Sequence, residues 1–197
     1  MTREELAKEI ALGLILTEVE GPFDTVVSSS DGDYPSIGCS CWEGPRADEL
    51  LSMIPGGDKF AERSMSDLEE SGDIEALEEL LGSVEGIRAQ KQMLANDALE
   101  YVDILTDIEG FDDSRSIIYA GIWCPTSHYT VAKFIKNRMD EYNMNKLEGI
   151  CDAFYAEYAH AAGCDEYEEG YQNRANNTYD YVSDLDLSDY GVPPYTK

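Results

Sequence analysis

The sequence predicts a mainly α-helical protein with one small β-hairpin region, an α+β fold. Apolar residues recur at intervals of three and four along most of the chain, which is typical of amphipathic helices. The exception is the stretch 25–42, where β-branched residues precede Asp31-Gly32, a strong hairpin signal. The length of 197 residues and the hydrophobic fraction of 43% suit one folded domain.

The first helix is expected to begin at a capping box. The Thr2 hydroxyl and the Glu5 carboxylate would each accept a backbone amide left unpaired at the helix start. Gly21-Pro22 would end this helix, because proline lacks an amide proton and clashes with the preceding turn. Glu20 is then expected at the C-terminal end, where the helix dipole favours the protonated form of a carboxyl group.

The hairpin region follows directly. Residues 25–27 are β-formers, residues 28–33 have turn composition, and residues 34–42 are expected to form the return strand or strands. Cys39 and Cys41 alternate within this segment, so their side chains are expected to share one face.

The rest of the chain is predicted to be helical. Pro45 suits the first turn of a helix, and Ser66 with Glu69 forms a second candidate capping box. Further helices are expected over residues 73–81, 84–108, 113–123, 129–142, 147–162 and 167–182, with an extended end beyond them. We expect a main domain over residues 1–165, with residues 166–197 as a Tyr/Asp-rich helix and tail of the same domain.

The charge excludes one class of partner. The chain has 14 basic and 41 acidic residues, for a net charge of −27. Because phosphate binding needs Lys and Arg, we expect no nucleic-acid binding, and an anionic membrane is disfavoured. The carboxylates are interleaved with apolar residues, which favours solvated helix faces. Adaptation to salt, a cationic partner and mimicry of DNA remain alternatives.

The cysteines and histidines suggest neither disulfides nor a metal site. An odd number of cysteines without a signal peptide indicates free thiols in a reducing compartment. His128 and His160 fit no metal-ligand spacing, so we expect no metal and no cofactor. The first 16 residues contain acids and are too short to cross a bilayer, so no targeting segment or membrane insertion is expected. The five cysteines are Cys39, Cys41, Cys124, Cys151 and Cys164.

A family resemblance lies in residues 18–51. A glutamate is followed by glycine, an aromatic residue, a valine, an aspartate-containing turn, Ser-Ile-Gly, tryptophan, Gly-x-Arg-Ala and Leu-Leu. These residues are Glu20, Gly21, Phe23, Val27, Asp31, Ser36-Ile37-Gly38, Trp42, Gly44, Arg46-Ala47 and Leu50-Leu51. The pattern resembles the lysozyme-like catalytic domains of phage endolysins, which are related to the chitosanase and lysozyme superfamily, and it covers about a sixth of the chain.

The resemblance implies a lysozyme-like fold and a muramidase that cleaves peptidoglycan. Glycoside hydrolysis needs a proton donor and a second group that stabilises positive charge or activates water. Glu20 is the expected acid and Asp31 the expected partner, with Asp33 as an alternative because both flank Gly32. Ser36 is expected to help position the water.

Three further residues are expected to contact substrate: Tyr34 in the turn, Cys41 and Trp42. Family members usually have glutamine directly before the tryptophan, and this chain has Cys41 there. The resemblance also implies a monomer held in the host cytoplasm before lysis and acting on the cell wall.

Other functions stay open at this point. A lytic transglycosylase needs only the glutamate, and a chitosanase would suit the acidic surface because chitosan is cationic. A non-enzymatic acidic binding protein, such as a DNA mimic or an inhibitor of a basic partner, would explain the charge. A cysteine peptidase using Cys39 or Cys41 is a weaker alternative, since neither histidine lies in a supporting motif.

Overall fold

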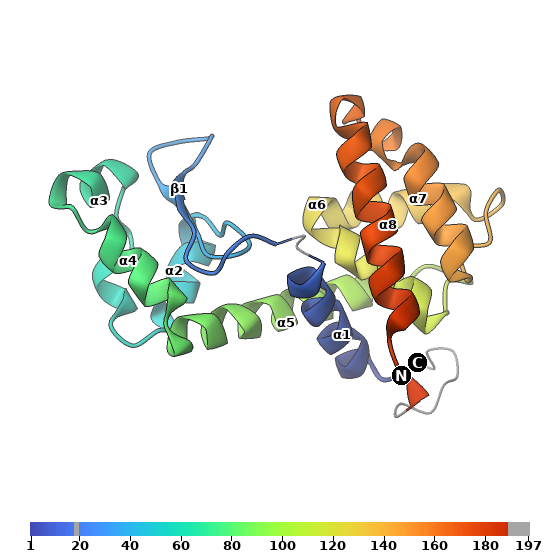
Figure 1. Cartoon of the computed structure of the whole chain (residues 1–197), viewed down its shortest axis with the longest axis horizontal. Helices are drawn as coiled ribbons and strands as arrows, with labels where there is room; N and C mark the ends of the chain where they lie inside the picture. The colour runs from blue at the N-terminus through green and yellow to red at the C-terminus, as the bar shows by residue number, and fades with distance from the viewer. Residues whose placement is uncertain (18–19, 189–197) are drawn as a thin grey trace. The chain divides into compact units, whose positions relative to one another are not determined.

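The computed structural model describes residues 1–17 and 20–188, and over these residues the protein is mainly helical with one two-stranded antiparallel sheet. The predicted mainly-α fold with a small hairpin is therefore confirmed. The chain forms two compact units, coloured by residue number in Figure 1. Unit 1 comprises residues 1–19 and 95–197, and unit 2 comprises residues 20–94. The two boundaries between the units, at residues 19–20 and 94–95, both lie within the main domain that the sequence analysis expects over residues 1–165.

Unit 2 contains the hairpin and four short helical segments. Strand β1 pairs antiparallel with β2, and the register places Val26 opposite Ile37 and Val27 opposite Ser36. The buried side chains of the helices, including Leu50, Leu68 and Leu77, form the core of this unit. Its elements are β1 (Val26–Ser28), β2 (Pro35–Ile37), α2 (Gly44–Ser52), η1 (Gly57–Phe60), α3 (Met65–Ser71), α4 (Ile74–Gly82) and the first half of α5 (Val84–Thr106).

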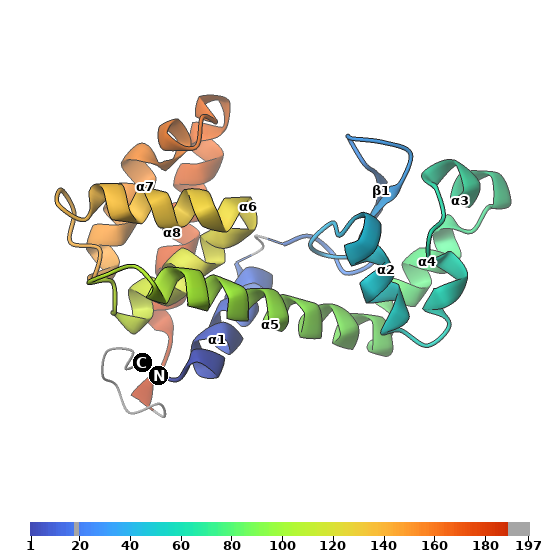
Figure 2. The ribbon, with the colours of Figure 1, turned by 180° about the vertical axis from the view of Figure 1, so that it is seen from behind.

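Unit 1 is a helical bundle with an aromatic core. Helix α6 crosses α7 and α8 in Figure 2, and α7 packs along α8. Trp123 is completely buried, and its ring contacts those of Phe154 and Tyr158, each at a centroid distance of 4.8 Å. The elements are α1 (Arg3–Leu16), the second half of α5, α6 (Ser114–Arg138), α7 (Leu147–Ala161), η2 (Asp165–Tyr167) and α8 (Glu168–Asp184).

Two glycines allow α1 and α6 to approach closely. A β-carbon at Gly121 would collide with Ile10, and one at Gly13 would collide with Ile122. Each isoleucine therefore packs against the glycine of the opposite helix. This reciprocal contact joins the N-terminal helix to residues more than a hundred positions later in the chain.

Several predicted boundaries are confirmed and two are wrong. The Thr2–Glu5 capping box is present, but α1 ends at Leu16 with Thr17 as its C-cap, rather than at Gly21. The Gly21 amide instead donates a 2.8 Å bond to the Cys39 carbonyl in unit 2, so this part of the chain has left the helix. Glu20 is therefore not at a helix end, and the helix dipole, which decays within the last turn, does not explain its chemistry.

The second capping box is formed by other residues than predicted. Ser64 and Asp67 make the reciprocal bonds at the start of α3, not Ser66 and Glu69. The amide and the hydroxyl of Ser66 both donate to Asp33, so Ser66 is engaged elsewhere.

Helix α6 is interrupted at Ser127, whose backbone is extended with φ of 176° and ψ of 108°, so the two helices predicted on either side of Pro125 are present. The Ser127 hydroxyl accepts the Thr130 amide, which is the bond that an N-cap residue makes at the start of a helix. No helix among the described residues is long and apolar enough to cross a membrane.

Candidate functional site

The candidate site is built on a tight reverse turn, residues 38–41, in unit 2. Ile37 and Trp42 exchange two backbone hydrogen bonds of 2.9 Å and so close the turn. Within it, Gly38 and Cys41 adopt left-handed backbone angles, with φ of +71° and +49°. Left-handed angles are uncommon for a residue with a side chain, so Cys41 is a strained position. The prediction that Cys39 and Cys41 share one face of a strand is therefore wrong, because both residues belong to the turn.

Gln90 of α5 holds this turn from inside the unit. Its side chain is completely buried, and its oxygen accepts the Cys39 amide at 2.8 Å. Its amide nitrogen donates to the carbonyls of Phe23 and Leu81, both at 3.0 Å. A buried amide with three partners is fully satisfied and rigid, so Gln90 fixes the turn to the segment that follows Glu20.

Glu20 is placed beside the turn by two contacts. The Gly21 amide donates to the Cys39 carbonyl at 2.8 Å, which fixes the backbone next to Glu20. The Ser40 hydroxyl then donates to the Glu20 carboxylate at 2.9 Å. The side chain is half-buried. A carboxyl group in this setting is oriented by the protein while still reachable from solvent.

Ser36 and Glu43 form a second polar pair at the same turn. They flank Ile37 and Trp42, and the Ser36 hydroxyl donates to the Glu43 carboxylate. Ser36 is buried, with 4% of its surface exposed, and Glu43 is half-buried. The predicted positioning residue thus contacts a carboxylate that the sequence analysis did not single out.

Asp31 and Asp33 have different surroundings. Asp31 is exposed, and its hydrogen bonds are local: its amide donates to Ser29 and its carboxylate accepts from Ser30. Asp33 accepts two 3.0 Å bonds from Ser66 at the start of α3. Asp33 therefore ties the hairpin to α3, which is a structural role.

The three residues expected to contact substrate differ in accessibility. Trp42 is only 6% exposed, and its ring packs over Gly38, so it supports the turn from beneath. Tyr34 is half-buried and lines a hollow of about 260 Å³ with Phe60 and residues of α2. Cys41 is exposed at the tip of the turn.

The thiols near Glu20 are held in the neutral form. Burial, followed by the negative charge of Glu20, raises the pKa of Cys39 to about 12. Burial and then the charges of Glu20 and Glu43 raise the pKa of Cys41 above its usual value. Because the thiolate is the nucleophile in cysteine catalysis, these shifts oppose the cysteine-peptidase alternative.

The histidines belong to unit 1 and have other partners. His128 lies against the rings of Tyr101 and Tyr129, and His160 pairs with Asp165 at 3.1 Å. Across residues 1–17 and 20–188, no group of three or more His, Cys, Asp or Glu side chains is arranged to hold a metal ion.

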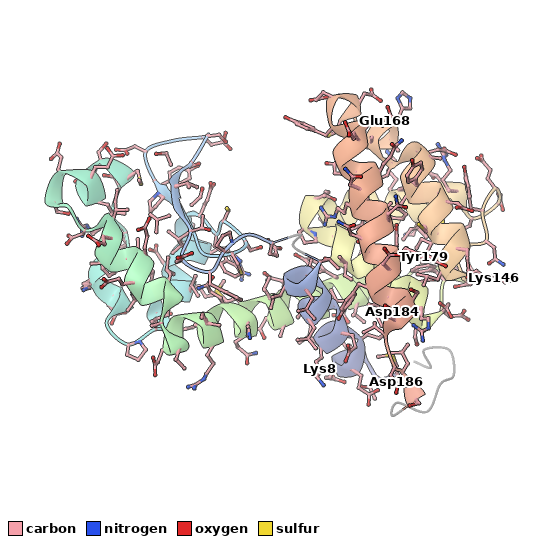
Figure 3. The ribbon with its side chains drawn as sticks, in the orientation of Figure 1. Lys8, Lys146, Glu168, Tyr179, Asp184 and Asp186 are labelled. Atoms are coloured by element: carbon pink, nitrogen blue, oxygen red, sulfur yellow. The ribbon has the colours of Figure 1, made fainter. Side chains whose placement is uncertain are left out.

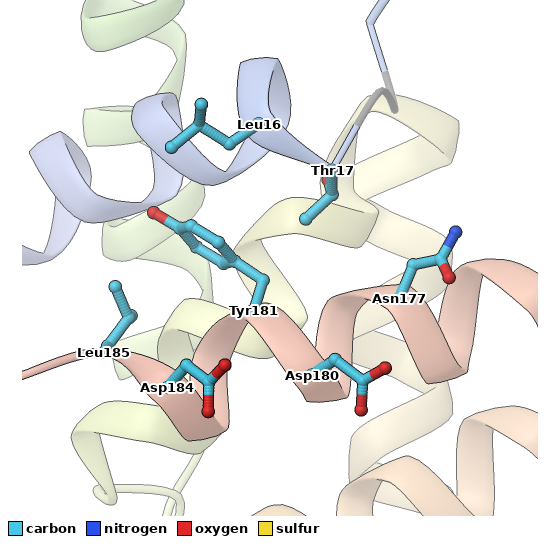
Figure 4. A pocket seen from close by; sticks show the side chains of 7 residues that line it. All are labelled: Leu16, Thr17, Asn177, Asp180, Tyr181, Asp184 and Leu185. Carbon is cyan, nitrogen blue, oxygen red and sulfur yellow. The ribbon is translucent and has the colours of Figure 1, made fainter.

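Unit 1 has an open polar groove between α1 and α8. It has a volume of about 490 Å³, and the carboxylates of Asp180 and Asp184 lie one helical turn apart on its α8 side (Figure 4). The acidic side chains of α8 lie near its two ends, with Glu168 and Glu169 at the start and Asp180 and Asp184 at the end; Figure 3 labels Glu168 and Asp184. The groove is also lined by Leu16, Thr17, Asn177, Tyr181 and Leu185.

Sequence reasoning missed three residues of the turn site: Ser40, Glu43 and Gln90. A signal for Gln90 was present, because it shares a helix face with the buried Met93 and Leu94, and a polar residue there needs partners. Ser40 and Glu43 gave no comparable signal, since their contacts depend on the turn geometry.

Comparisons of the chain with models of protein families, with curated proteins and with solved structures gave no match.

Proposed function

We propose that the protein is a glycoside hydrolase that cleaves peptidoglycan, with a lysozyme-like fold and with Glu20 as the general acid. The observation that carries the proposal is the placement of Glu20. Its backbone is fixed by the Gly21–Cys39 bond and its carboxylate by Ser40, at the position where the sequence resembles lysozyme-like domains.

The proposed chemistry needs a carboxylic acid that is oriented but accessible. Glu20 would protonate the glycosidic oxygen as the bond to the sugar carbon breaks. The Ser40 hydroxyl donates to one oxygen of the carboxyl group and so fixes its orientation. The resemblance in the sequence assigns Asp31 as the second group, which would stabilise positive charge or activate water.

Chitosan is a second candidate substrate. The net charge of −27 and the carboxylates of Asp180 and Asp184 in the unit 1 groove would attract a cationic polysaccharide. The same charge would serve a non-enzymatic protein that sequesters a basic partner, and this alternative predicts no cleavage of any polysaccharide.

The test is the clearing rate of purified Gram-positive peptidoglycan, and of chitosan, by the wild type and by Glu20→Gln. The amide keeps the shape and cannot donate the proton, so clearing is expected to fall on the order of a thousandfold. Glu49→Gln is the matched control, since Glu49 lies on exposed α2 surface and pairs with Arg46. Equal clearing by wild type and Glu20→Gln would refute the assignment of the acid. A wild type that clears neither polymer would refute the enzyme.

A further inference from the structure

Serine hydroxyls in and beside the reverse turn at residues 38–41 hold two carboxylates. Ser40 within the turn bonds Glu20, and Ser36 just before the turn bonds Glu43 just after it. Ile37 and Trp42 exchange both backbone bonds, so Ser36 and Glu43 are the next residues across the ladder. Cross-strand neighbours have side chains within contact distance on one face. The Ser36–Glu43 pair is therefore a consequence of the turn.

The Glu43 side chain is not used to cap helix α2. Glu43 is the N-cap residue of α2, a position where a side-chain oxygen commonly accepts a helix amide. In the described structure the Glu43 side chain makes no such bond and is held by Ser36 instead. Pro45 in the first turn reduces the number of amides that need a cap.

Asp31 lacks comparable support. Its carboxylate is exposed and accepts a 3.4 Å bond from the neighbouring Ser30. Catalytic carboxylates need to be held within a narrow range of positions by surrounding hydrogen bonds and packing. Glu43 meets this requirement, because its partner Ser36 is buried in strand β2.

We propose that Glu43, positioned by Ser36, is the second carboxylate of the Glu20 site and acts as the general base. This inference rests on the proposed glycosidase function and replaces Asp31 in that role. Exposed Cys41 follows Ser40, which bonds Glu20, and precedes Glu43 by two residues, and the charges of both acids act on its thiol.

The proposed step is balanced. The Glu20 carboxyl gives its proton to the glycosidic oxygen as the bond from that oxygen to the sugar carbon breaks. A water oxygen bonds to the same carbon, and the Glu43 carboxylate accepts the proton that this water loses. Exchange with solvent then restores Glu20 to its acid form and Glu43 to its anion. The products are two sugar ends that together contain one added water.

The first experiment compares clearing by Glu43→Gln, Asp31→Asn and the control Glu49→Gln, each after its melting temperature has been measured. Glu43→Gln is expected to lose about a hundredfold or more while keeping the wild-type melting temperature. Adding azide to Glu43→Ala is expected to restore turnover and to yield a glycosyl azide, because the small anion needs no base. Wild-type clearing by Glu43→Gln, or a loss confined to Asp31→Asn, would overturn the inference while leaving Glu20 as the acid. A wild type that clears nothing would remove the proposed function and this inference together.

The second experiment does not depend on activity. The rate of Cys41 alkylation by iodoacetamide is measured at pH 8 by peptide mass spectrometry. Glu20→Gln and Glu43→Gln are each expected to raise it severalfold, because removing a nearby negative charge increases the thiolate fraction. Glu49→Gln is expected to leave the rate unchanged. A wild-type rate in Glu43→Gln would mean that Glu43 does not face the turn.

Ser36→Ala tests the positioning role of Ser36. Loss of its hydrogen bond to Glu43 is expected to lower kcat about tenfold with little change in KM, and Ser36→Thr, which keeps the hydroxyl, is expected to restore most of the loss. Equal kcat values for Ser36→Ala and the wild type would exclude this role, even if the variant were less stable.

Discussion

The side-chain oxygen of Gln90 accepts a 2.8 Å hydrogen bond from the backbone amide of Cys39. This bond joins residues 51 positions apart, and it connects the long helix α5 to the turn that holds Glu20. The same side chain donates to Phe23 and Leu81, so one residue fixes three segments of unit 2.

Replacing Gln90 by methionine is expected to destabilise the protein by about 2–4 kcal/mol, because three backbone groups would lose a hydrogen-bond partner and two of these bonds are buried. The measurement is urea unfolding followed by circular dichroism. Glu100→Met, at an exposed position ten residues later on the same helix, is the control and is expected to change stability by less than about 0.5 kcal/mol. Equal stabilities of the two variants would contradict the role assigned to Gln90.

Gly38→Ala tests the close contact inside the turn. An added β-carbon would lie 2.6 Å from the Gln90 oxygen and 3.1 Å from the Trp42 ring, at a φ of +71°. Gly72 is a matched control, because its φ is +72° and an added β-carbon would meet nothing within 4 Å. Gly72→Ala is expected to cost about 1–2 kcal/mol for the left-handed backbone alone. Gly38→Ala is expected to cost about 2 kcal/mol more, as measured by chemical unfolding.

The two aspartates of the hairpin turn are expected to respond differently to alanine. Asp33→Ala removes both bonds to Ser66 and should lower stability by about 1–2 kcal/mol. Asp31→Ala should change stability by less than about 0.5 kcal/mol, since Asp31 is exposed and bonded only locally. Thermal unfolding of both variants checks this difference, and a larger effect for Asp31 would be inconsistent with the structure.

Cys39 is expected to make the protein sensitive to alkaline pH. Its folded pKa of about 12 lies above the usual value of 9.0. The thiol therefore contributes its stability in full below pH 9 and loses it as the pH rises toward 12, by about 4 kcal/mol in all. Between pH 7 and 10.5, wild-type stability should fall about 2 kcal/mol more than that of Cys39→Ala. Urea unfolding at the two pH values measures this difference. An equal loss of stability in the wild type and in Cys39→Ala would contradict the burial of the Cys39 thiol.

The helical pattern of the sequence was a good guide to the elements. Thr2 and Glu5 predict the start of α1 correctly, because a capping box depends only on residues three apart. The end of α1 was wrong because it depends on a distant partner: Gly21 bonds Cys39 in the hairpin rather than continuing the helix. Ser66 shows the same limit, since Asp33 engages it from another element.

The candidate site was predictable only in part. The sequence identified Glu20 and Ser36, which the turn does hold in defined positions. It gave no means to choose between Asp31 and Asp33, and it did not single out Glu43, because the surroundings of each carboxylate depend on which hydroxyl the fold brings to it. The cysteines were misplaced for a similar reason: alternation predicts a strand, whereas the positive φ values of Gly38 and Cys41 turn the chain back within four residues.

The interlocked glycines and isoleucines of α1 and α6 have a consequence for biosynthesis. Ile10 and Gly13 meet Gly121 and Ile122, so unit 1 is assembled from both ends of a chain that contains unit 2 between them. A ribosome makes the chain from its N-terminus, and it releases all of unit 2 before it has made α6. The apolar face of α1 is therefore without its partner α6 while unit 2 folds. A nascent chain halted near residue 100 would expose that face to chaperones.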